Sequence, residues 1–134
     1  MASIRREILL QAKPADVWDA VRDVGAIHRR LAPGFVVATE LEPGGAARVV
    51  TFGNGLTARE LIVDIDDAAR RLVWSVVGGR MTHHNASVQL FEEAGATRFV
   101  WIADLLPHEL APAIAAMIDQ AIAAISATFA TRTS

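Results

Sequence analysis

Cysteine is absent from the 134-residue sequence, and lysine occurs only once, as Lys13. Without cysteine the chain has no disulfide, no reactive thiolate and no Cys-ligated zinc site, and the sequence does not reveal its redox compartment. The arginines are scattered among acidic residues, form no basic run, and leave a formal net charge of −2. A nucleic acid or another polyanion is therefore not expected as a partner, because little would neutralise its phosphates.

Long uninterrupted apolar runs are also missing. The longest weakly polar stretch, Leu105–Ala130, contains His108, Glu109, Asp119 and Gln120. This composition favours a helix packed against a core over a helix that spans lipid. The N-terminus lacks the apolar block of a signal peptide. We therefore expect a soluble, cytoplasmic protein with no membrane span.

The composition is that of a globular protein. Hydrophobic residues make up 52% of the chain and charged residues 21%, which excludes disorder. A chain of this length suits one domain, expected over residues 1–134, and buries about two thirds of its unfolded surface. We find no internal repeat, low-complexity tract or linker.

Local patterns predict one strand, two short helices, six strands and a long helix, in that order. Alternating apolar residues indicate a strand over Ser3–Gln11. Pro14 and Asp16 suit the first turn of a helix, and Gly25 ends it. The remaining elements are a short helix over Ala26–Ala32, strands over Phe35–Leu41, Ala47–Phe52, Thr57–Ile65, Arg71–Val77, Thr82–Phe91 and Thr97–Leu105, and a helix that begins at Pro107.

The last helix is the one element long enough to cover an antiparallel sheet made of successive hairpins, so an α+β fold is expected. A curved sheet around a single helix is difficult to fill completely, and a ligand would occupy the remaining space. The helix has one apolar stripe, which consists of Leu110, Ile114, Met117, Ile118, Ala121, Ile125 and Phe129.

Several short motifs occur along the chain in a characteristic order. They are Ala15-Asp16-Val17-Trp18, Arg59-Glu60-Leu61 followed by Asp66-Asp67, Arg71-Leu72-Val73-Trp74-Ser75, Gly78-Gly79, and Val100-Trp101 ahead of Pro107. In this order and spacing they resemble the START-like or SRPBCC superfamily, which includes polyketide cyclases, birch pollen allergen relatives and plant abscisic acid receptors. The resemblance covers nearly the whole chain. It implies the helix-grip fold, in which a curved seven-stranded antiparallel sheet wraps around a long C-terminal helix, with two short helices after the first strand.

Glu60 is the first candidate site residue, and it shares its strand face with Ala58 and Ile62. If Leu61 and Val63 face the core, Glu60 is simply solvated, although a strand bulge would change this assignment. The resemblance to the plant receptors favours a Glu60 that faces the cavity and binds a water or a ligand hydroxyl. In an apolar cavity the pKa of this carboxyl would be raised, so Glu60 could act as an acid or base.

His83 and His84 form the second candidate feature. Neighbouring residues of a strand project to opposite faces, so this pair does not share a metal ion, and we expect no metal or other cofactor. One of the two should face inward, and the sequence does not fix which. The resemblance places Met81, His83 and Ala86 among pocket residues, where His83 could contact a ligand or transfer a proton. Two histidines at the rim near a turn is an equally good interpretation.

Apolar residues complete the expected lining. Trp74, Val76 and Trp101 would form a flat wall suited to an aromatic or polycyclic molecule, with Ile114 and Ile118 on the terminal helix opposite. For any one of Trp74, Val76 and Trp101 alone, ordinary core is the better explanation, and only the group suggests a ligand.

The resemblance also assigns a gate loop over the cavity to Asn54-Gly55-Leu56, although a plain turn explains the same residues. Lys13 lies outside the expected cavity, so no lysine would bind a ligand carboxylate there. An arginine such as Arg48 could replace it, but nothing requires this, and an acidic ligand is not expected. Ser75 and Ser87 lie on strands without a nucleophile elbow, so nucleophilic catalysis has little support.

Three functions follow. The first is binding of a small hydrophobic molecule (aromatic, polycyclic or lipid-like) that Glu60 and His83 orient. The second is a cyclase- or dehydratase-type enzyme with Glu60 and His83 as its acid and base. The third is a protein-interaction module whose interior is filled by side chains. The sequence does not fix the oligomeric state, and a homodimer is compatible with it.

Overall fold

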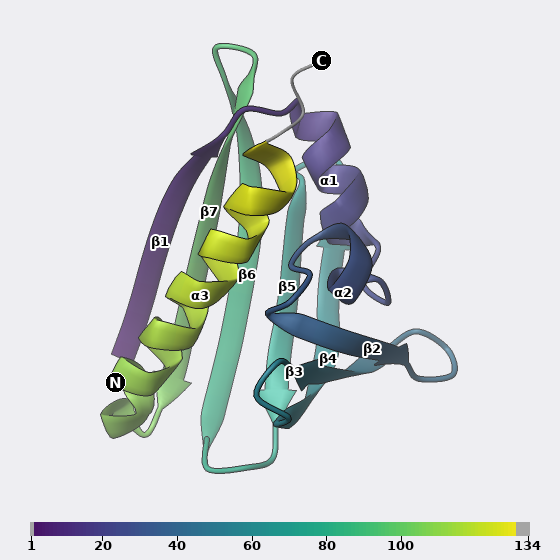
Figure 1. The fold of residues 1–134 in the computed structure, drawn as a ribbon. Helices are drawn as coiled ribbons and strands as arrows, with labels where there is room; N and C mark the ends of the chain where they lie inside the picture. Colours follow the sequence, from purple (N-terminus) through teal and green to yellow (C-terminus); the bar gives the residue numbers. More distant parts are fainter. Residues whose placement is uncertain (1, 131–134) are drawn as a thin grey trace.

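A seven-stranded antiparallel sheet forms the body of the protein in the computed structural model, which describes residues 2–130 (Figure 1). The strand order is β1-β7-β6-β5-β4-β3-β2, so all neighbouring strands except β1 and β7 are consecutive in the chain. The strands are β1 (Ala2–Leu10), β2 (Val36–Leu41), β3 (Ala47–Phe52), β4 (Thr57–Asp66), β5 (Arg71–Val77), β6 (His83–Glu93) and β7 (Ala96–Leu106). The helices are α1 (Pro14–Arg22), α2 (Ile27–Arg30), the 3-10 turn η1 (His108–Leu110) and α3 (Ala111–Ala130).

The order of elements agrees with the sequence patterns, and the expected fold class is confirmed. The differences lie at element ends. The last helix starts with the 3-10 turn η1 and becomes α-helical at Ala111, whereas the sequence predicted one helix from Pro107. Pro112 follows at once, and a proline suits the first turn because the amide hydrogen it lacks would have no partner there.

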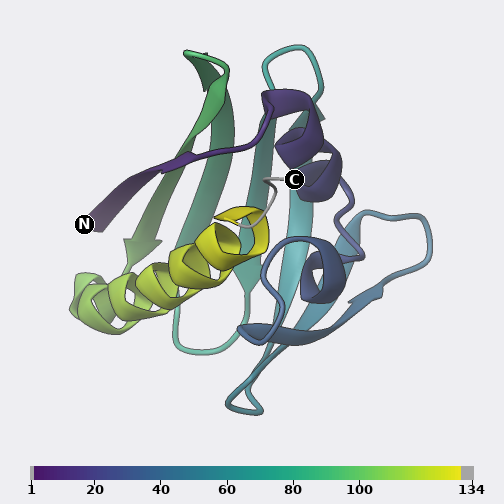
Figure 2. The same ribbon diagram turned by 45° about the horizontal axis from the view of Figure 1, so that its top comes forward.

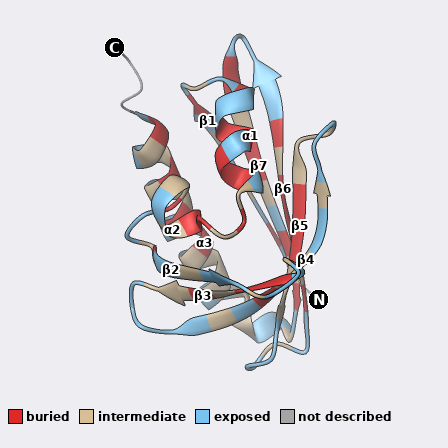
Figure 3. Ribbon diagram, turned by 90° about the vertical axis from the view of Figure 1, so that its right-hand side faces the viewer, coloured by how far each residue is buried: buried red, intermediate tan, exposed pale blue. Residues whose placement is uncertain are grey.

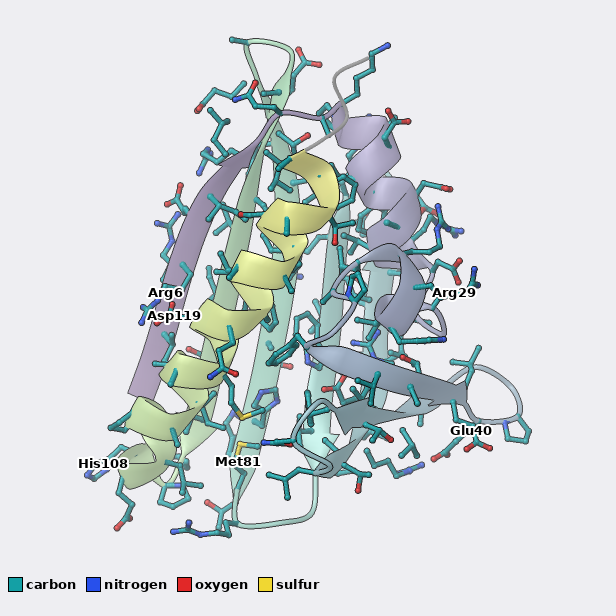
Figure 4. All side chains as sticks on the ribbon, in the orientation of Figure 1. Arg6, Arg29, Glu40, Met81, His108 and Asp119 are labelled. Carbon is teal, nitrogen blue, oxygen red and sulfur yellow. The ribbon has the colours of Figure 1, made fainter. Side chains whose placement is uncertain are left out.

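Helix α3 lies across the concave face of the sheet, as the views in Figures 1 and 2 agree. It buries Ile118, Ala121, Ile125 and Phe129, which recur at helical spacing and pack into the central core. Its outer side is tied to the edge strand β1 by an ion pair between Arg6 Nε and Asp119 Oδ1, 2.7 Å apart, and Figure 4 shows these two side chains close together.

The segment His108–Ala130 is long and apolar enough to cross a membrane by length and composition. In this fold its buried residues contact the sheet instead, which is the arrangement of a soluble-type protein.

Helices α1 and α2 cover the half of the concave face that α3 leaves open. Helix α1 buries Val17, Trp18 and Val21. The indole Nε1 of Trp18 donates to Asp67 Oδ1 over 2.8 Å, and so connects α1 to the turn between β4 and β5. In Figure 3 the buried residues gather where the helices and the middle strands face one another.

A bulge in β4 decides which of its residues face inward. The pairing with β5 passes from Ile62 to Asp64 and skips Val63, which is 56% exposed. The extra residue shifts the alternation, so Ile62 and Ile65 both pack against the core although three positions separate them. Glu60 lies on the inward side before the bulge. The bulge therefore allows a buried acidic residue and an inward Ile65 on the same strand.

Candidate functional site

A cavity of about 330 Å³ is bounded by the concave face of the sheet and by α3. Residues of strands β2 to β7 and of helices α1, α2 and α3 form its wall, and most of them are aliphatic or aromatic. Of the expected ligand-binding residues, only His83 does not line this cavity. The expected residues that line it are Glu60, Trp74, Val76, Met81, Trp101, Ile114 and Ile118.

Glu60 forms an ion pair with Arg48 inside the cavity wall. The two residues face each other in the register of β3 and β4, and Arg48 Nε donates to Glu60 Oε1 over 2.8 Å. Only 3% of Arg48 and 7% of Glu60 is exposed. The guanidinium also donates from Nη1 to the carbonyl of Val24 over 3.2 Å, and its Cζ lies 5.8 Å from the ring centroid of Trp74. These contacts offset the cost of removing both charges from water.

The pair changes what Glu60 offers to a ligand. The expectation of a Glu60 carboxyl in purely apolar surroundings is wrong because Arg48 supplies a buried opposite charge at contact distance. The alternative of a solvated Glu60 is wrong as well. The arrangement presents a guanidinium and a carboxylate side by side, so it offers hydrogen-bond donors and an acceptor at one place in an apolar wall.

Of the two neighbouring histidines, His84 lines the cavity and His83 is exposed. The expectation that His83 faces inward is therefore wrong. Strand β6 begins at His83, and its buried even-numbered residues include Ala86 and Val88, so the alternation turns His84 inward. Met81 does line the cavity, but it lies in the loop before the strand, and the alternation of β6 cannot be extended back to it. The structure consequently does not bring together Glu60 and His83 as an acid–base pair.

The His84 ring replaces a backbone contact between two strands. The paired register of β5 and β6 ends at Trp74 and Ala86. Beyond this point the amide of Val76 donates to Nδ1 of His84 over 3.0 Å, and the hydroxyl of Ser75 donates to the His84 carbonyl. An Nδ1 that accepts a hydrogen bond carries no proton, so the neutral ring has its proton on Nε2.

The environment of His84 keeps the ring neutral. Burial, and secondly the charge of His83, lower the pKa of His84 from its ordinary value of 6.5 to about 4, although Asp104 acts in the opposite direction. A histidine with this pKa does not exchange protons near neutral pH.

Two tryptophans give the cavity a rigid aromatic wall. Trp74 and Trp101 pack edge to face, with ring centroids 5.4 Å apart and an angle of 73° between their planes. Nε1 of Trp101 is buried and has no hydrogen-bond partner among residues 2–130. Because this atom is shielded even from water, the tryptophan contributes apolar surface and not a donor to the cavity.

Two loops and the first turns of α3 form the mouth of the cavity. Leu56, in the β3–β4 loop, is 63% exposed and still contributes to the lining. Asn54 Oδ1 accepts from the amide of Leu56 over 3.0 Å, and Gly55 has a positive φ of 89°, so this loop is a tight turn. The β5–β6 loop is the second of these loops. Its residue Met81 lines the cavity, and Figure 4 shows Met81 close to this loop.

No group of three or more His, Asp or Glu side chains within the described part of the chain is placed to hold a metal ion. Ser75 donates to a backbone carbonyl and so is not poised as a nucleophile.

The curved sheet, the long covering helix and the two short helices after β1 define the helix-grip class of proteins. The family model described as "Polyketide cyclase / dehydrase and lipid transport" matches residues 1–132, and the chain belongs to this family. Family and fold together support hydrophobic-ligand binding or polyketide cyclase chemistry in general terms. No curated protein matches the sequence.

Solved structures share this fold at low sequence identity. XoxI from Bacillus cereus has a TM-score of 0.87 at 18% identity, covering 98% of this chain and 97% of that one. The crystal structure of Ara h 8.0201 has a TM-score of 0.77 at 18% identity, covering 98% and 99%. The di-domain ARO/CYC protein BexL has a TM-score of 0.76 at 18% identity over 97% of this chain and 46% of that one, about half of its length. Identities this low show the fold alone.

The sequence contains one signal for the buried position of Arg48 and one for that of His84. Arg48 is the only charged residue of the strand Ala47–Phe52, and such an isolated charge in an apolar strand signals a buried partner. For His84 the signal was the shared parity with Ala86, Val88 and Leu90.

Proposed function

We propose that this protein binds a small, mostly apolar molecule, of aromatic, polycyclic or lipid-like character, in the cavity between the sheet and α3. The observation that supports this most directly is an apolar-lined space of about 330 Å³ whose wall includes the buried Arg48–Glu60 pair. A cytoplasmic location belongs to the same proposal, since the fold is of a soluble type.

Apolar contact supplies most of the binding free energy in this proposal. Enclosing about 300 Å² of ligand surface contributes roughly 7 kcal/mol before the entropic losses of association. Trp74 and Trp101 contact one side of the ligand, and Ile114 and Ile118 on α3 contact the other. Arg48 and Glu60 orient whatever polar group the ligand carries.

The arrangement gives less support to a cyclase- or dehydratase-type reaction. General acid–base chemistry needs two groups that hold and release protons beside the substrate. His83 is exposed, and the pKa of His84, at about 4, keeps that ring neutral. Glu60 is committed to Arg48.

The test is to fill the cavity and measure binding of a fluorescent apolar probe such as 1-anilinonaphthalene-8-sulfonate, together with an uncharged analogue. Ile118→Trp puts a large side chain into the space, and Ala123→Trp puts the same side chain on the exposed face of the same helix. We expect Ile118→Trp to weaken probe binding at least about tenfold and Ala123→Trp to leave it unchanged. Equal binding by all three proteins would overturn the proposal.

If Ile118→Trp does not fold, as judged by circular dichroism, Val76→Phe fills the same cavity from the opposite wall. Native mass spectrometry of the purified protein complements the titration, since a retained metabolite identifies the ligand class by its mass.

A further inference from the structure

His84 presents a hydrogen-bond donor of fixed identity to the cavity. We propose that His84 is a specificity-determining residue, which donates its Nε2–H to an oxygen acceptor on the ligand, so the ligand is an apolar molecule with a carbonyl, ether or hydroxyl oxygen. This inference rests on the proposed function, because it names a feature of the molecule that the cavity binds.

The hydrogen bonds of His84 fix which ring nitrogen carries the proton. The Val76 amide donates to Nδ1 over 3.0 Å, at the point where the paired register of β5 and β6 has ended. A second contact, from the Ser75 hydroxyl to the His84 carbonyl, holds the backbone of the same residue. The ring therefore cannot flip or change tautomer without leaving a buried amide unpaired.

The other ring nitrogen of His84, Nε2, carries the proton and has a different environment. His84 is only 9% exposed and lines the cavity. Among residues 2–130, the buried side-chain polar atoms that are shielded from water and lack a partner belong to His28, Thr39 and Trp101. Nε2 of His84 is not one of them and has no acceptor within the described part of the chain, so it borders open space. A ligand acceptor placed there would satisfy a donor that the fold leaves free.

His84 differs from Arg48 and Glu60, the other polar groups of the cavity wall considered above. Arg48 and Glu60 form an ion pair with each other, and the guanidinium also donates to the Val24 carbonyl, so both of these polar groups carry charge. The neutral Nε2–H of His84, by contrast, is a donor without an accompanying acceptor or charge. It favours an uncharged oxygen on the ligand and gives no advantage to a hydrocarbon or to an ammonium group.

The experiment uses two naphthalenes of nearly equal shape, 2-acetylnaphthalene and 2-ethylnaphthalene, of which only the first has an acceptor. Their affinities are measured through the fluorescence of Trp74 and Trp101, with calorimetry as a second readout. Wild type is compared with His84→Asn, whose side-chain oxygen can still accept from the Val76 amide but which has no donor at the Nε2 position. His84→Gln is the matched control, because its amide nitrogen restores a donor near Nε2.

We expect His84→Asn to reduce the preference for the ketone over the hydrocarbon about five- to tenfold, and His84→Gln to keep most of it. The infrared carbonyl stretch of bound 2-acetylnaphthalene should lie at lower frequency in wild type than in His84→Asn. An unchanged preference and carbonyl frequency in His84→Asn overturns the role of His84 while the proposed function stands. If neither naphthalene binds to wild type, the proposed function fails and this inference fails with it.

A measurement without ligand keeps the inference falsifiable if the variants do not fold. Nitrogen-15 NMR of the His84 ring in wild type should show a proton on Nε2 and none on Nδ1 throughout the range from about pH 6 to 8. A proton on Nδ1 overturns the inference directly.

Discussion

Arg48 and Glu60 are cross-strand neighbours on β3 and β4, and their side chains meet inside the wall of the cavity, 2.8 Å apart. Through Nη1 of Arg48 the pair reaches the carbonyl of Val24 in the segment after α1, and through its guanidinium it contacts Trp74 on β5. One ion pair thus connects the helical cover, the outer strands and the aromatic wall.

Removing one member of this pair should destabilise the protein more than removing both. Arg48→Met leaves the Glu60 carboxylate buried without a partner, and we expect a loss of about 3 kcal/mol in the free energy of unfolding. The double variant Arg48→Met/Glu60→Leu removes both charges and should lie within about 1 kcal/mol of wild type. Urea denaturation measures wild type, the single variants Arg48→Met and Glu60→Leu, and the double variant. If the double variant is as unstable as the sum of its single variants, the two side chains are not coupled.

The chain's periodicity predicts the fold well because each element forms from local signals. Alternation along the strands, Pro14 at the start of α1 and the apolar stripe of α3 are all visible in short windows. The family motifs then add the arrangement of these elements. What short windows do not contain is the register between strands, and the Arg48–Glu60 pair depends on it.

The inward position of Glu60 agrees with the family resemblance, but it depends on a bulge at Val63, which alternation alone does not reveal. The resemblance favours His83, but the alternation of β6 places His84 on the same face as the buried Ala86 and Val88. Site residues in the middle of regular strands, such as Trp74 and Trp101, were placed correctly on the cavity.

Trp18 should stabilise the packing of α1 through the single hydrogen bond that its indole Nε1 donates to Asp67. Trp18→Phe keeps most of the ring but removes the donor to Asp67 Oδ1, and we expect a loss of about 1–2 kcal/mol in unfolding free energy. Arg22→Gln is the control, since it removes an exposed ion pair with the same carboxylate and should cost less than about 0.5 kcal/mol. Thermal and urea unfolding compare the two. A larger loss in the Arg22 variant would mean that the surface charge, and not the indole, holds this helix.

His84 should make the protein less stable in mild acid. Its pKa is depressed from 6.5 to about 4 in the folded state, so between these values the unfolded chain binds more protons than the native one. The stability associated with His84 is therefore complete above about pH 6.5 and is lost as the pH falls towards 4, on the order of 2–3 kcal/mol in total.

His84→Asn isolates this contribution, because asparagine does not titrate in this range and can still accept from the Val76 amide. Urea unfolding at several pH values between about 4 and 7 should show a steeper decline for wild type than for the variant. Parallel stability profiles for the two proteins would show that His84 is protonated equally in the folded and unfolded states.

Val63 and Ile65 test the bulge that turns Glu60 into the cavity. On a regular strand these two residues would share one face, opposite to Glu60, and substitutions at both would behave alike. In the structure Val63 is exposed and Ile65 packs against the core. Val63→Lys should therefore change the unfolding free energy by no more than about 0.5 kcal/mol, whereas Ile65→Lys should cost at least about 2 kcal/mol because it brings a charge to the core. Urea unfolding measures both costs, and equally large costs would mean that β4 is regular and that Glu60 faces solvent. The cavity would then lack its ion pair, and Arg48 would be the buried charge in need of another partner.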